Sequence, residues 1–184
     1  MRMLLHVCCG PCAVSPLNQL REEHSEYEVT GYFYNPNIHP YKEFARRLDT
    51  LKEFAAAIGL NNLVIDERYT LEEFLRRALA AVDGRCRSCY DMRMRQTASY
   101  AKEHGFDCFS TTLLVSPYQQ HELIRQAAQA AAAAEGIPFM YIDFRPGWQQ
   151  GVKISRQLEM YRQPYCGCIF SEKDRYCKSR QEER

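Results

Sequence analysis

The sequence predicts a doubly wound α/β fold of three layers around a mainly parallel sheet of five strands. Five short runs rich in apolar and β-branched residues are separated mostly by helical patterns, and crossovers of that length join parallel strands. The 184 residues are enough for one domain with a sizeable core. We expect residues 1–171 to form this domain. Residues 172–184 hold five basic and four acidic groups and few apolar ones, which predicts a loose polar tail.

The predicted strands are residues 3–7, 29–34, 63–65, 108–114 and 139–144. The first is a continuous apolar run, typical of a strand that is buried on both faces. The spacing of apolar residues predicts a helix after the first strand, another over 41–58, and a third from Thr70, where a capping-box pattern lies. Further helices are predicted from Cys86 to His104, over the alanine-rich segment that ends at Gly136, and near 152–160.

Composition and charge are those of an ordinary soluble globular protein. Hydrophobic residues are 46% and charged residues 26% of the chain, which excludes wholesale disorder. The formal net charge of +1 argues against a nucleic-acid binder driven by charge alone, but it leaves room for a local basic patch. The N-terminal apolar stretch is too short for a signal peptide, and no run approaches the length of a membrane span. We therefore expect a cytoplasmic protein with no membrane partner.

Cysteine is the unusual feature of the composition. Seven of the nine cysteines fall in three tight groups, which are Cys8-Cys9-Gly-Pro-Cys12, Cys86-x-x-Cys89 and Cys166-Gly-Cys168. In a cytosolic protein, grouped cysteines more often bind metal or do redox chemistry than form structural disulfides. The two C-x-x-C spacings suit structural zinc and an iron–sulfur cluster equally, with disulfide redox chemistry a weaker third. Cys108 and Cys177 stand alone, and an inert thiol explains each.

The predicted strands end in polar loops. In doubly wound folds the ligand lies beyond the carboxyl ends of the strands. The loops after Val7, Tyr34 and Leu114 carry CCGPC, NPNIHP and residues 116–121. We therefore expect a cysteine-rich metal site at this edge of the sheet, surrounded by the polar groups of the three loops.

Six ordered segments of the chain resemble the epoxyqueuosine reductase QueH family. They are MLLHVCCGPC, YFYNPNIHPYKEFARRL, CRSCYDMRMRQTASYA, FSTTLLVSPYQQH, FRPGWQQG and YRQPYCGCIFS, and together they span residues 3–171. The resemblance implies an adenine-nucleotide-hydrolase-like (HUP-type) α/β fold with a [4Fe–4S] cluster and an adjacent iron ion. It also implies the last step of queuosine biosynthesis, in which epoxyqueuosine in tRNA is deoxygenated to queuosine.

The resemblance also implies roles for the grouped cysteines. A [4Fe–4S] cluster needs four thiolates, or three with an open iron. Our hypothesis is that Cys9, Cys86 and Cys89 anchor the cluster. Cys8 or a cysteine of the 166–168 segment would complete it.

The thiols left over would serve a second iron. Cys12 and the remaining cysteines would hold this iron, which as a Lewis acid would weaken a carbon–oxygen bond of the epoxide. Cys166 and Cys168 have another possible role, because two thiols one residue apart could cycle to a disulfide and relay electrons. The alternative for this pair is a closing turn without chemistry.

Polar side chains after the predicted strands are candidate substrate ligands. Asn35, Asn37 and His39 would hydrogen-bond the modified base, and His39 would donate a proton as the epoxide opens. A loop that satisfies its own backbone is the alternative for these three. The other candidates for the substrate site follow the fourth strand or lie in the resembling segments: Arg93, Thr111, Thr112, Ser116, Gln119, His121, Arg145 and Arg162. For Thr111, an ordinary β-branched strand residue is an equal alternative.

Residues 76–95 carry six arginines against two aspartates, a local excess of four positive charges. Arginine contacts to phosphate would hold the anticodon loop of a tRNA and would make binding depend strongly on salt. A solvated helix face is the alternative. The implied partners are therefore a tRNA that carries epoxyqueuosine and an external electron donor, which the sequence does not name.

Two other functions fit parts of the sequence. An ATP-using tRNA-modifying enzyme of the pyrophosphatase type would share the fold class. Its phosphate loop would be rich in Gly and Ser after the first strand, where this chain has CCGPC. A zinc-stabilised RNA-binding module without catalysis would be colourless, whereas the iron hypothesis predicts a brown protein that bleaches in air.

Overall fold

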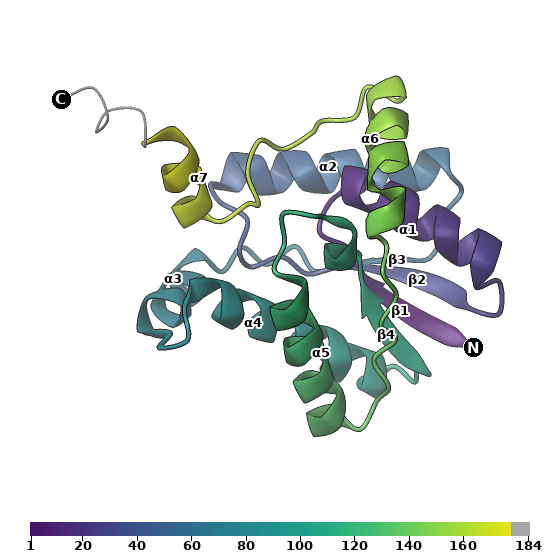
Figure 1. Cartoon of the computed structure of the whole chain (residues 1–184), viewed down its shortest axis with the longest axis horizontal. Coiled ribbons are helices and arrows are strands. Elements are labelled where there is room, and N and C mark those ends of the chain that lie inside the picture. Colours follow the sequence, from purple (N-terminus) through teal and green to yellow (C-terminus); the bar gives the residue numbers. More distant parts are fainter. Residues whose placement is uncertain (178–184) are drawn as a thin grey trace.

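A four-stranded parallel sheet forms the centre of the molecule (Figure 1). The computed structural model describes residues 1–177. The strands lie in the order β3-β2-β1-β4, and every neighbouring pair is parallel. The elements follow along the chain as β1 (Arg2–His6), α1 (Gly10–Glu23), β2 (Glu28–Phe33), α2 (Tyr41–Ala57), β3 (Leu63–Ile65), α3 (Leu71–Ala80), α4 (Arg85–Glu103), β4 (Cys108–Thr111), the 3₁₀ helix η1 (Thr112–Val115), α5 (His121–Glu135), the 3₁₀ helix η2 (Arg145–Gly147), α6 (Trp148–Gln157) and α7 (Ile169–Tyr176).

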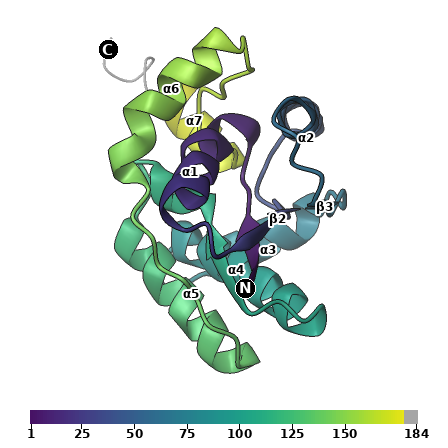
Figure 2. The same ribbon diagram turned by 90° about the vertical axis from the view of Figure 1, so that its right-hand side faces the viewer.

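Helices cover both faces of this sheet. Helices α1, α2 and α6 lie on one side of it, and α3, α4 and α5 lie on the other (Figure 1 and Figure 2). Helix α1 packs against α2 and α6, and α4 packs against α5 and α3. The sheet with its two helical layers is the α/β arrangement that the sequence predicts. None of the helices within residues 1–177 is long and apolar enough to cross a membrane.

The centre of the sheet is β1, which pairs with β2 on one side and with β4 on the other. Met3, Leu4 and Leu5 of β1 are fully buried, because helices cover both faces of the strand. The chain winds from β1 through α1 to β2 and β3, and then crosses back to place β4 on the opposite side. The carboxyl ends of β1 and β4 therefore form the switch point at which doubly wound folds bind ligands.

The fifth strand predicted at residues 139–144 is wrong. This segment forms one isolated bridge, in which the Phe109 amide donates to the Pro138 carbonyl over 3.0 Å and the Met140 amide donates to the Phe109 carbonyl over 2.9 Å. The Met140 carbonyl accepts from the Ser110 hydroxyl at 2.8 Å. A side chain thus takes the place of a further ladder bond, and the chain leaves the sheet.

Two other boundaries and one helix cap differ from the prediction. The fourth strand ends at Thr111, because the Thr111 hydroxyl accepts from the Leu113 amide at 3.1 Å and the chain turns into η1. Helix α3 follows Thr70 as predicted, but the Thr70 side chain makes no capping hydrogen bond. Helix α6 begins at Trp148, ahead of the predicted start.

The loose tail predicted from residue 172 is wrong up to Tyr176, because α7 continues to that residue. Cys168 caps this helix, since its sulfur accepts from the Ser171 amide at 3.3 Å. The sulfur is a second acceptor for this amide, which also donates to the Cys168 carbonyl at 3.0 Å, and both bonds hold the first turn of a short, polar helix. The rest of the predicted tail, residues 178–184, lies outside the described residues.

Candidate metal centre

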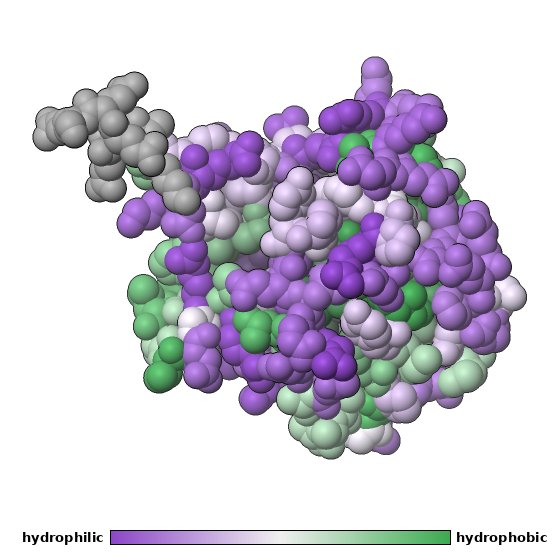
Figure 3. Space-filling view, viewed as in Figure 1, coloured by the Kyte–Doolittle hydropathy of each residue, from purple (hydrophilic) through white to green (hydrophobic). Residues whose placement is uncertain are grey.

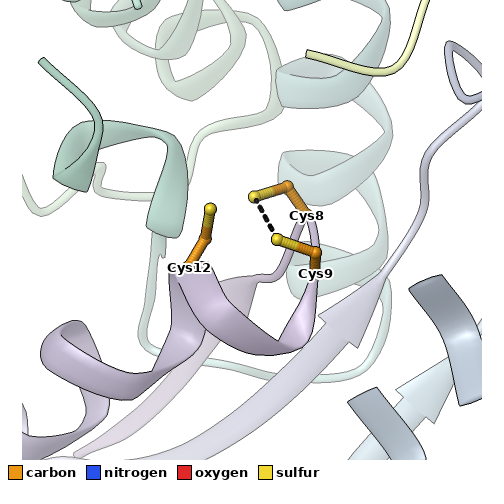
Figure 4. Close-up of side chains that lie close together, drawn as sticks. All are labelled: Cys8, Cys9 and Cys12. Atoms are coloured by element: carbon orange, nitrogen blue, oxygen red, sulfur yellow. Dashed lines mark hydrogen bonds between the residues drawn. The ribbon is translucent and has the colours of Figure 1, made fainter. Parts of the chain in front are cut away.

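Three cysteine thiols meet where β1 runs into α1. The sulfur atoms of Cys8, Cys9 and Cys12 all lie within 4.8 Å of one another, and those of Cys8 and Cys9 are 3.8 Å apart (Figure 4). Adjacent side chains on a strand point to opposite faces, but β1 ends at His6, so the turn that follows lets both thiols face Cys12. Cys9 is the N-cap of α1 and Cys12 lies in its first turn. We call Cys8, Cys9 and Cys12 the thiol trio.

Two neighbours hold the thiol trio from outside. The Thr112 hydroxyl, just beyond β4, accepts from the Cys8 amide at 3.2 Å and donates to the Cys8 sulfur at 3.5 Å. The Gln163 side-chain amide donates to the Cys9 sulfur at 3.0 Å. The trio therefore lies between the carboxyl ends of β1 and β4, at the edge where the sequence predicts a cysteine-rich site. Sequence reasoning misses Gln163, whose only signal is its place in the segment YRQPYCGCIFS.

Negative charge is shared unevenly within the thiol trio. Hydrogen bonds from the Cys12 and Cys9 thiols hold the pKa of Cys8 well below its usual value. The bond with Cys12 lowers the pKa of Cys9, but its bond to Cys8 and its burial outweigh this and raise the pKa to about 12. Bonding to the other two sulfurs, together with burial, raises the pKa of Cys12. A Cys8 thiolate that accepts from two thiols is a starting point for metal binding, since thiol ligands must be deprotonated.

The other four grouped cysteines lie near one another on α4 and in the turn before α7. The Cys166 and Cys168 sulfurs are 4.0 Å apart. Cys89 packs against the apolar cluster that includes Cys168. Burial raises the pKa of the Cys86 and Cys89 thiols, and the charge of Cys166 adds to the rise in both. The topology thus gathers cysteines that are far apart in the sequence. We call residues 166–168 the CGC turn.

Arg47 of α2 holds the CGC turn in place. Its Nη1 and Nη2 donate to the carbonyls of Cys166 and Tyr165 at 3.0 and 3.1 Å, and its Nε donates to Glu43 at 2.6 Å. Gly167 has a φ of +126°, which residues with a side chain rarely adopt. A Cβ at Gly167 would also lie 2.9 Å from Nη1 of Arg47. The conformation of the turn therefore depends on glycine and on one buried arginine.

All three cysteine groups lie at the N-terminal ends of helices. Cys9 and Cys168 are the N-caps of α1 and α7, and Cys86 and Cys89 lie in the first two turns of α4. The helix dipole places partial positive charge there, which favours thiolates. The hydrogen bond with Cys168 lowers the pKa of Cys166 to about 5, whereas burial raises that of Cys89 to about 11. The cysteine groups therefore include a thiol that ionises easily, Cys166, and a buried thiol, Cys89, that would lose its proton only when a metal binds.

Four of the predicted substrate ligands are buried in the core with partners of their own: Asn35, Arg93, Thr111 and Thr112. The Asn35 Nδ2 donates to the Val7 carbonyl at 2.9 Å, and its Oδ1 accepts from Arg93 at 2.8 Å. The two threonine hydroxyls hold the start of η1 and the Cys8 backbone. Because these side chains already hydrogen-bond to other parts of the protein, the structure favours a positioning role for them over direct contact with substrate.

Asn37 and His39 have buried polar atoms without partners. In the described part of the chain, no group hydrogen-bonds the Asn37 Oδ1 or either ring nitrogen of His39. The His39 ring centre lies 5.0 Å from that of Phe74 and 5.7 Å from that of Tyr69, and burial lowers the His39 pKa to about 4. The His39 backbone amide donates to the Gly167 carbonyl at 2.8 Å. Buried polar atoms without partners are rare in proteins and point to a ligand beside the CGC turn.

Further predicted ligands lie between η1 and the start of α5 and in η2. Ser116 follows η1, and the Gln119 Oε1 accepts from the hydroxyl of a tyrosine on α4 at 2.7 Å. Arg145 is exposed and pairs with Asp143 at 2.6 Å. His121 begins α5, and neither of its ring nitrogens has a hydrogen-bond partner within the described residues. Of this group, His121 is therefore the residue with unused hydrogen-bonding capacity.

A small cavity that is partly open to solvent lies beside Cys12. Trp148, Arg162 and Gln163 line it. The Gln163 Oε1 is buried and has no hydrogen-bond partner among the residues described. Arg162 donates to the Val152 carbonyl at 3.4 Å, which leaves most of its N–H groups unused. A polar molecule in this cavity would therefore meet both donors and an acceptor next to the thiol trio.

The predicted basic patch is largely neutralised. Three of its six arginines pair with acidic side chains: Arg77 with Glu73, Arg85 with Asp174 and Arg87 with Asp91. Arg93 is buried, and Arg76 and Arg95 are exposed. The surface around α3 mixes hydrophilic groups with hydrophobic ones, which include the exposed Leu79 and Val82 (Figure 3). The free positive charge of this region is therefore smaller than the number of arginines suggests.

A protein-family model matches the sequence over nearly its whole length. This model, epoxyqueuosine reductase QueH, matches residues 3–174. The chain belongs to this family. The match begins before the thiol trio and ends beyond the CGC turn, so all seven grouped cysteines lie within it.

Curated relatives support the same assignment. A protein of Dehalococcoides mccartyi named epoxyqueuosine reductase QueH is 40% identical over 177 residues, which cover 96% of this chain and 96% of that protein. A protein of the same name from Thermotoga maritima is 34% identical, and the match covers 92% of this chain and 89% of the relative. One from Haemophilus influenzae is also 34% identical, with 94% of this chain and 72% of the relative covered. The similarity to the QueH family thus spans the fold and the cysteine site together.

Proposed function

We propose that this chain reduces epoxyqueuosine to queuosine in tRNA, the last step of queuosine biosynthesis. The observation that carries the proposal is the thiol trio at the switch point of an α/β sheet, in a chain of the QueH family. In the reaction an epoxide loses its oxygen as water and becomes an alkene, which consumes two electrons and two protons. A partly buried set of seven cysteines is suited to hold a redox group that supplies the electrons.

A [4Fe–4S] cluster and an adjacent iron ion form the proposed redox group, on a fold of the HUP type. The donor set fits them, because thiolates are the usual ligands of such clusters, and the Gln163 Oε1, which has no partner among the described residues, belongs to an amide whose Nε2 contacts the Cys9 and Cys12 sulfurs. When bound, the group would pass electrons, and its single iron would act as a Lewis acid. The residues that would hold it are Cys8, Cys9, Cys12, Cys86, Cys89, Cys166 and Cys168.

The division of these cysteines between cluster and single iron is part of the proposal. Sulfurs around one tetrahedral ion with metal–sulfur bonds of about 2.3 Å lie about 3.8 Å apart. The 3.8 Å between the Cys8 and Cys9 sulfurs is of that size, and Cys12 lies within 4.8 Å of both. This spacing supports Cys12 and at least one neighbour in the thiol trio as ligands of the single iron. Cys86 and Cys89 remain the proposed anchors of the cluster.

His39 has a proposed role at the substrate. Burial lowers its pKa to about 4, so the ring is neutral at neutral pH and offers one N–H and one acceptor nitrogen. Neither ring nitrogen has a partner in the described part of the chain, and the Asn37 Oδ1 is also free. These observations support hydrogen bonding to the substrate more than the proton donation that the sequence predicts, because a neutral imidazole is a weak acid.

The CGC turn has a proposed second role as an electron relay. Oxidation of two thiols to a disulfide releases two electrons and two protons, the number that removal of the epoxide oxygen consumes. The Cys166 and Cys168 sulfurs are 4.0 Å apart, whereas a disulfide bond is about 2.05 Å long, so the turn would have to move. Alanine variants of either cysteine that keep full iron content and lose activity would support the relay. Full activity in both variants would rule it out.

The cavity beside Cys12 is the proposed entrance for the modified base. The Trp148 ring could stack on an extruded base, and Arg162 has N–H groups to spare for it. Exposed Arg76 and Arg95 would contact phosphates, which would make tRNA binding depend on salt. The proposed setting is the cytoplasm, with an external electron donor.

Metal analysis of anaerobically purified protein is the first test. We expect about four sulfides and more than four irons per chain, a brown colour that bleaches in air, and conversion of epoxyqueuosine in tRNA when a chemical reductant is added. One zinc per chain, no sulfide and no conversion would refute the reductase and favour a zinc-stabilised RNA-binding module. A requirement for ATP would favour an enzyme of the pyrophosphatase type.

A pair of cysteine variants sharpens this test. Cys12→Ala should lose the iron in excess of the cluster and should lose activity, while the sulfide content stays at the wild-type value. Cys108→Ala is the matched control, because Cys108 is a buried thiol in β4 outside the three cysteine groups. Equal iron content and activity in the two variants would contradict the role of Cys12.

A further inference from the structure

Arg93 is a buried cation inside the cysteine site. It lies on α4 one helical turn after Cys89, so the two side chains share a face of the helix. Only 3% of Arg93 is exposed. Its Nη2 donates to the Asn35 Oδ1 at 2.8 Å, and its Nε donates to the His6 Nε2 at 3.3 Å. A full positive charge therefore lies in the core, at the carboxyl ends of β1 and β2.

No carboxylate neutralises this charge within the described residues. None of the ion pairs formed by residues 1–177 includes Arg93. Arg47, which is equally buried, shows the ordinary arrangement, since its Nε pairs with Glu43 at 2.6 Å. A buried charge without a counter-charge is strongly unfavourable, so proteins pair such charges or place them against an anionic ligand. Arg93 thus requires an anion that is not an acidic side chain.

The hydrogen-bond partners of Arg93 are neutral. Arginine Nε always carries its proton, so the contact requires the unprotonated Nε2 of a neutral His6. The Nδ1 of His6 then donates to the Thr111 hydroxyl at 2.9 Å, and the Tyr34 carbonyl, 3.2 Å from Nε2, receives no proton in this tautomer. Asn35 is an uncharged amide, so none of these groups offsets the guanidinium.

The contacts of Arg93 place it between two cysteine groups. Its partner His6 lies two residues before Cys8 at the end of β1, and its partner Asn35 donates to the carbonyl of Val7, the residue next to Cys8. On α4, Cys89 lies one helical turn before Arg93 on the same face of the helix. The guanidinium therefore lies beside both groups, which are far apart in the sequence. The thiolates that would hold a metal are the anions that the buried guanidinium otherwise lacks.

We propose that Arg93 is the fixed counter-charge of the thiolate centre: it links the thiol trio to the α4 cysteines and favours the reduced state of the metal group that they hold. This inference rests on the proposed function. Arg93 is a positioning residue in this role, because it acts through the thiolates and not on the substrate. Each electron that enters a thiolate-bound iron centre adds negative charge, which a buried cation stabilises. Arg93 therefore raises the reduction potential of the centre.

Redox titration of the iron-loaded protein, followed by electron paramagnetic resonance, tests this role. Arg93→Met removes the charge and keeps much of the side-chain volume. We expect reduction to become about tenfold less favourable, a shift of about 59 mV to a more negative midpoint for a one-electron couple. Arg93→Lys keeps the charge and should shift the midpoint less than half as far. Lys102→Met is the matched control, because Lys102 is an exposed cation on the same helix, and it should leave the midpoint unchanged.

Two results would overturn the inference: an R93M protein that keeps its iron with the wild-type midpoint, or an R93K shift as large as that of R93M. For a variant that does not assemble the iron group, the zinc affinity of the metal-free protein is measured instead. We expect at least tenfold weaker zinc binding in R93M, since the thiolates lose their counter-charge, and an unchanged affinity would also overturn the inference. Wild-type protein without iron would refute the proposed function instead, and the zinc comparison would still decide the role of Arg93.

Discussion

The thiol trio and the CGC turn both begin helices, but the fold holds them in different ways. The trio directly follows the central strand, Cys9 and Cys12 are buried, and a threonine beyond β4 fixes the Cys8 backbone. The CGC turn lies in an irregular segment, and Cys166 is exposed. Arg47 holds the turn through two backbone carbonyls. One cysteine group is thus part of the core, and the other is attached to it.

This difference indicates which half of the site is preformed. The geometry of the thiol trio follows from the sheet and from α1, so the core sets it before any metal binds. The CGC turn depends on a few hydrogen bonds and on one glycine, so its position should respond when any of these is lost. Substitutions in the CGC turn should therefore leave the thiol trio intact. Substitution of Arg47 or Gly167, which hold the turn, should let the turn move.

Removal of a trio cysteine should have the largest effect. We expect Cys9→Ala to weaken zinc binding by the metal-free protein by more than the roughly 10–100-fold that loss of an outer-shell partner causes, because one of the three clustered donors disappears. Cys166→Ala should leave the tightest zinc site near its wild-type affinity, since the trio is preformed. Competition with a chromophoric chelator measures both affinities. An equal loss of zinc affinity in the two variants would show that the thiol trio and the CGC turn form a single zinc site that requires cysteines from both.

Removal of Arg47 should have the next largest effect. Arg47→Met leaves two carbonyls of the turn and the Glu43 carboxylate without their partner, and loss of one member of a buried pair costs about 3–5 kcal/mol. Urea unfolding measures the loss. The control is Arg46→Met on the same helix, where the guanidinium lies 3.6 Å from the centre of the Tyr161 ring, and we expect it to cost less than about 1 kcal/mol. Similar costs for both would contradict the special role of Arg47.

The buried His39 beneath the turn should make stability depend on pH. Burial lowers its pKa to about 4 in the folded protein, against 6.5 for an unperturbed ring. Below pH 6.5 the unfolded chain binds the proton and the folded chain does not, so stability falls as the pH drops from 6.5 to 4. The loss from this group is roughly 2–3 kcal/mol over that window.

Unfolding of the metal-free protein in urea at several pH values checks this prediction. His39→Phe suits the surrounding aromatic rings and should lose less stability on acidification than the wild type. His104→Phe replaces an exposed histidine and should keep the wild-type profile. The same acid profile in H39F and in the wild type would refute the prediction.

Substitution of the turn glycine should have the smallest effect. Gly167→Ala forces a side chain into positive φ and against Arg47, which we expect to cost about 1–2 kcal/mol. Gly136→Ala is the matched control, because Gly136 has a φ of +65° with open space around its missing Cβ. Alkylation of Cys166 should speed up in G167A alone, which mass spectrometry of the metal-free protein would detect. No difference in alkylation between the two variants would contradict the proposed sensitivity of the turn.

The sequence predicted much of this architecture because the signals are local. Apolar runs and helical spacing gave four strands of the sheet and the principal helices, and the cysteine groups were visible as spacings. The predicted strand at 139–144 failed because its composition fits a strand, while a distant serine, Ser110, binds the Met140 carbonyl. Local composition contains no information about such a partner. The predicted basic patch has less free charge than its arginines suggest, because Arg93 is buried and Arg85 pairs with the distant Asp174, whereas the other two pairs lie within one helical turn.

By itself the sequence determined the parallel sheet, the edge of the sheet at which the first cysteine group lies, and which cysteines are grouped. Only the tertiary structure decided that Cys8, Cys9 and Cys12 face one another, that Gln163 reaches two of them, and that Arg93 is buried with no acidic partner among residues 1–177. The physical reason is the range of the interactions. Periodicity and spacing act within a few residues, whereas burial and charge compensation depend on side chains that the chain brings together from across its whole length.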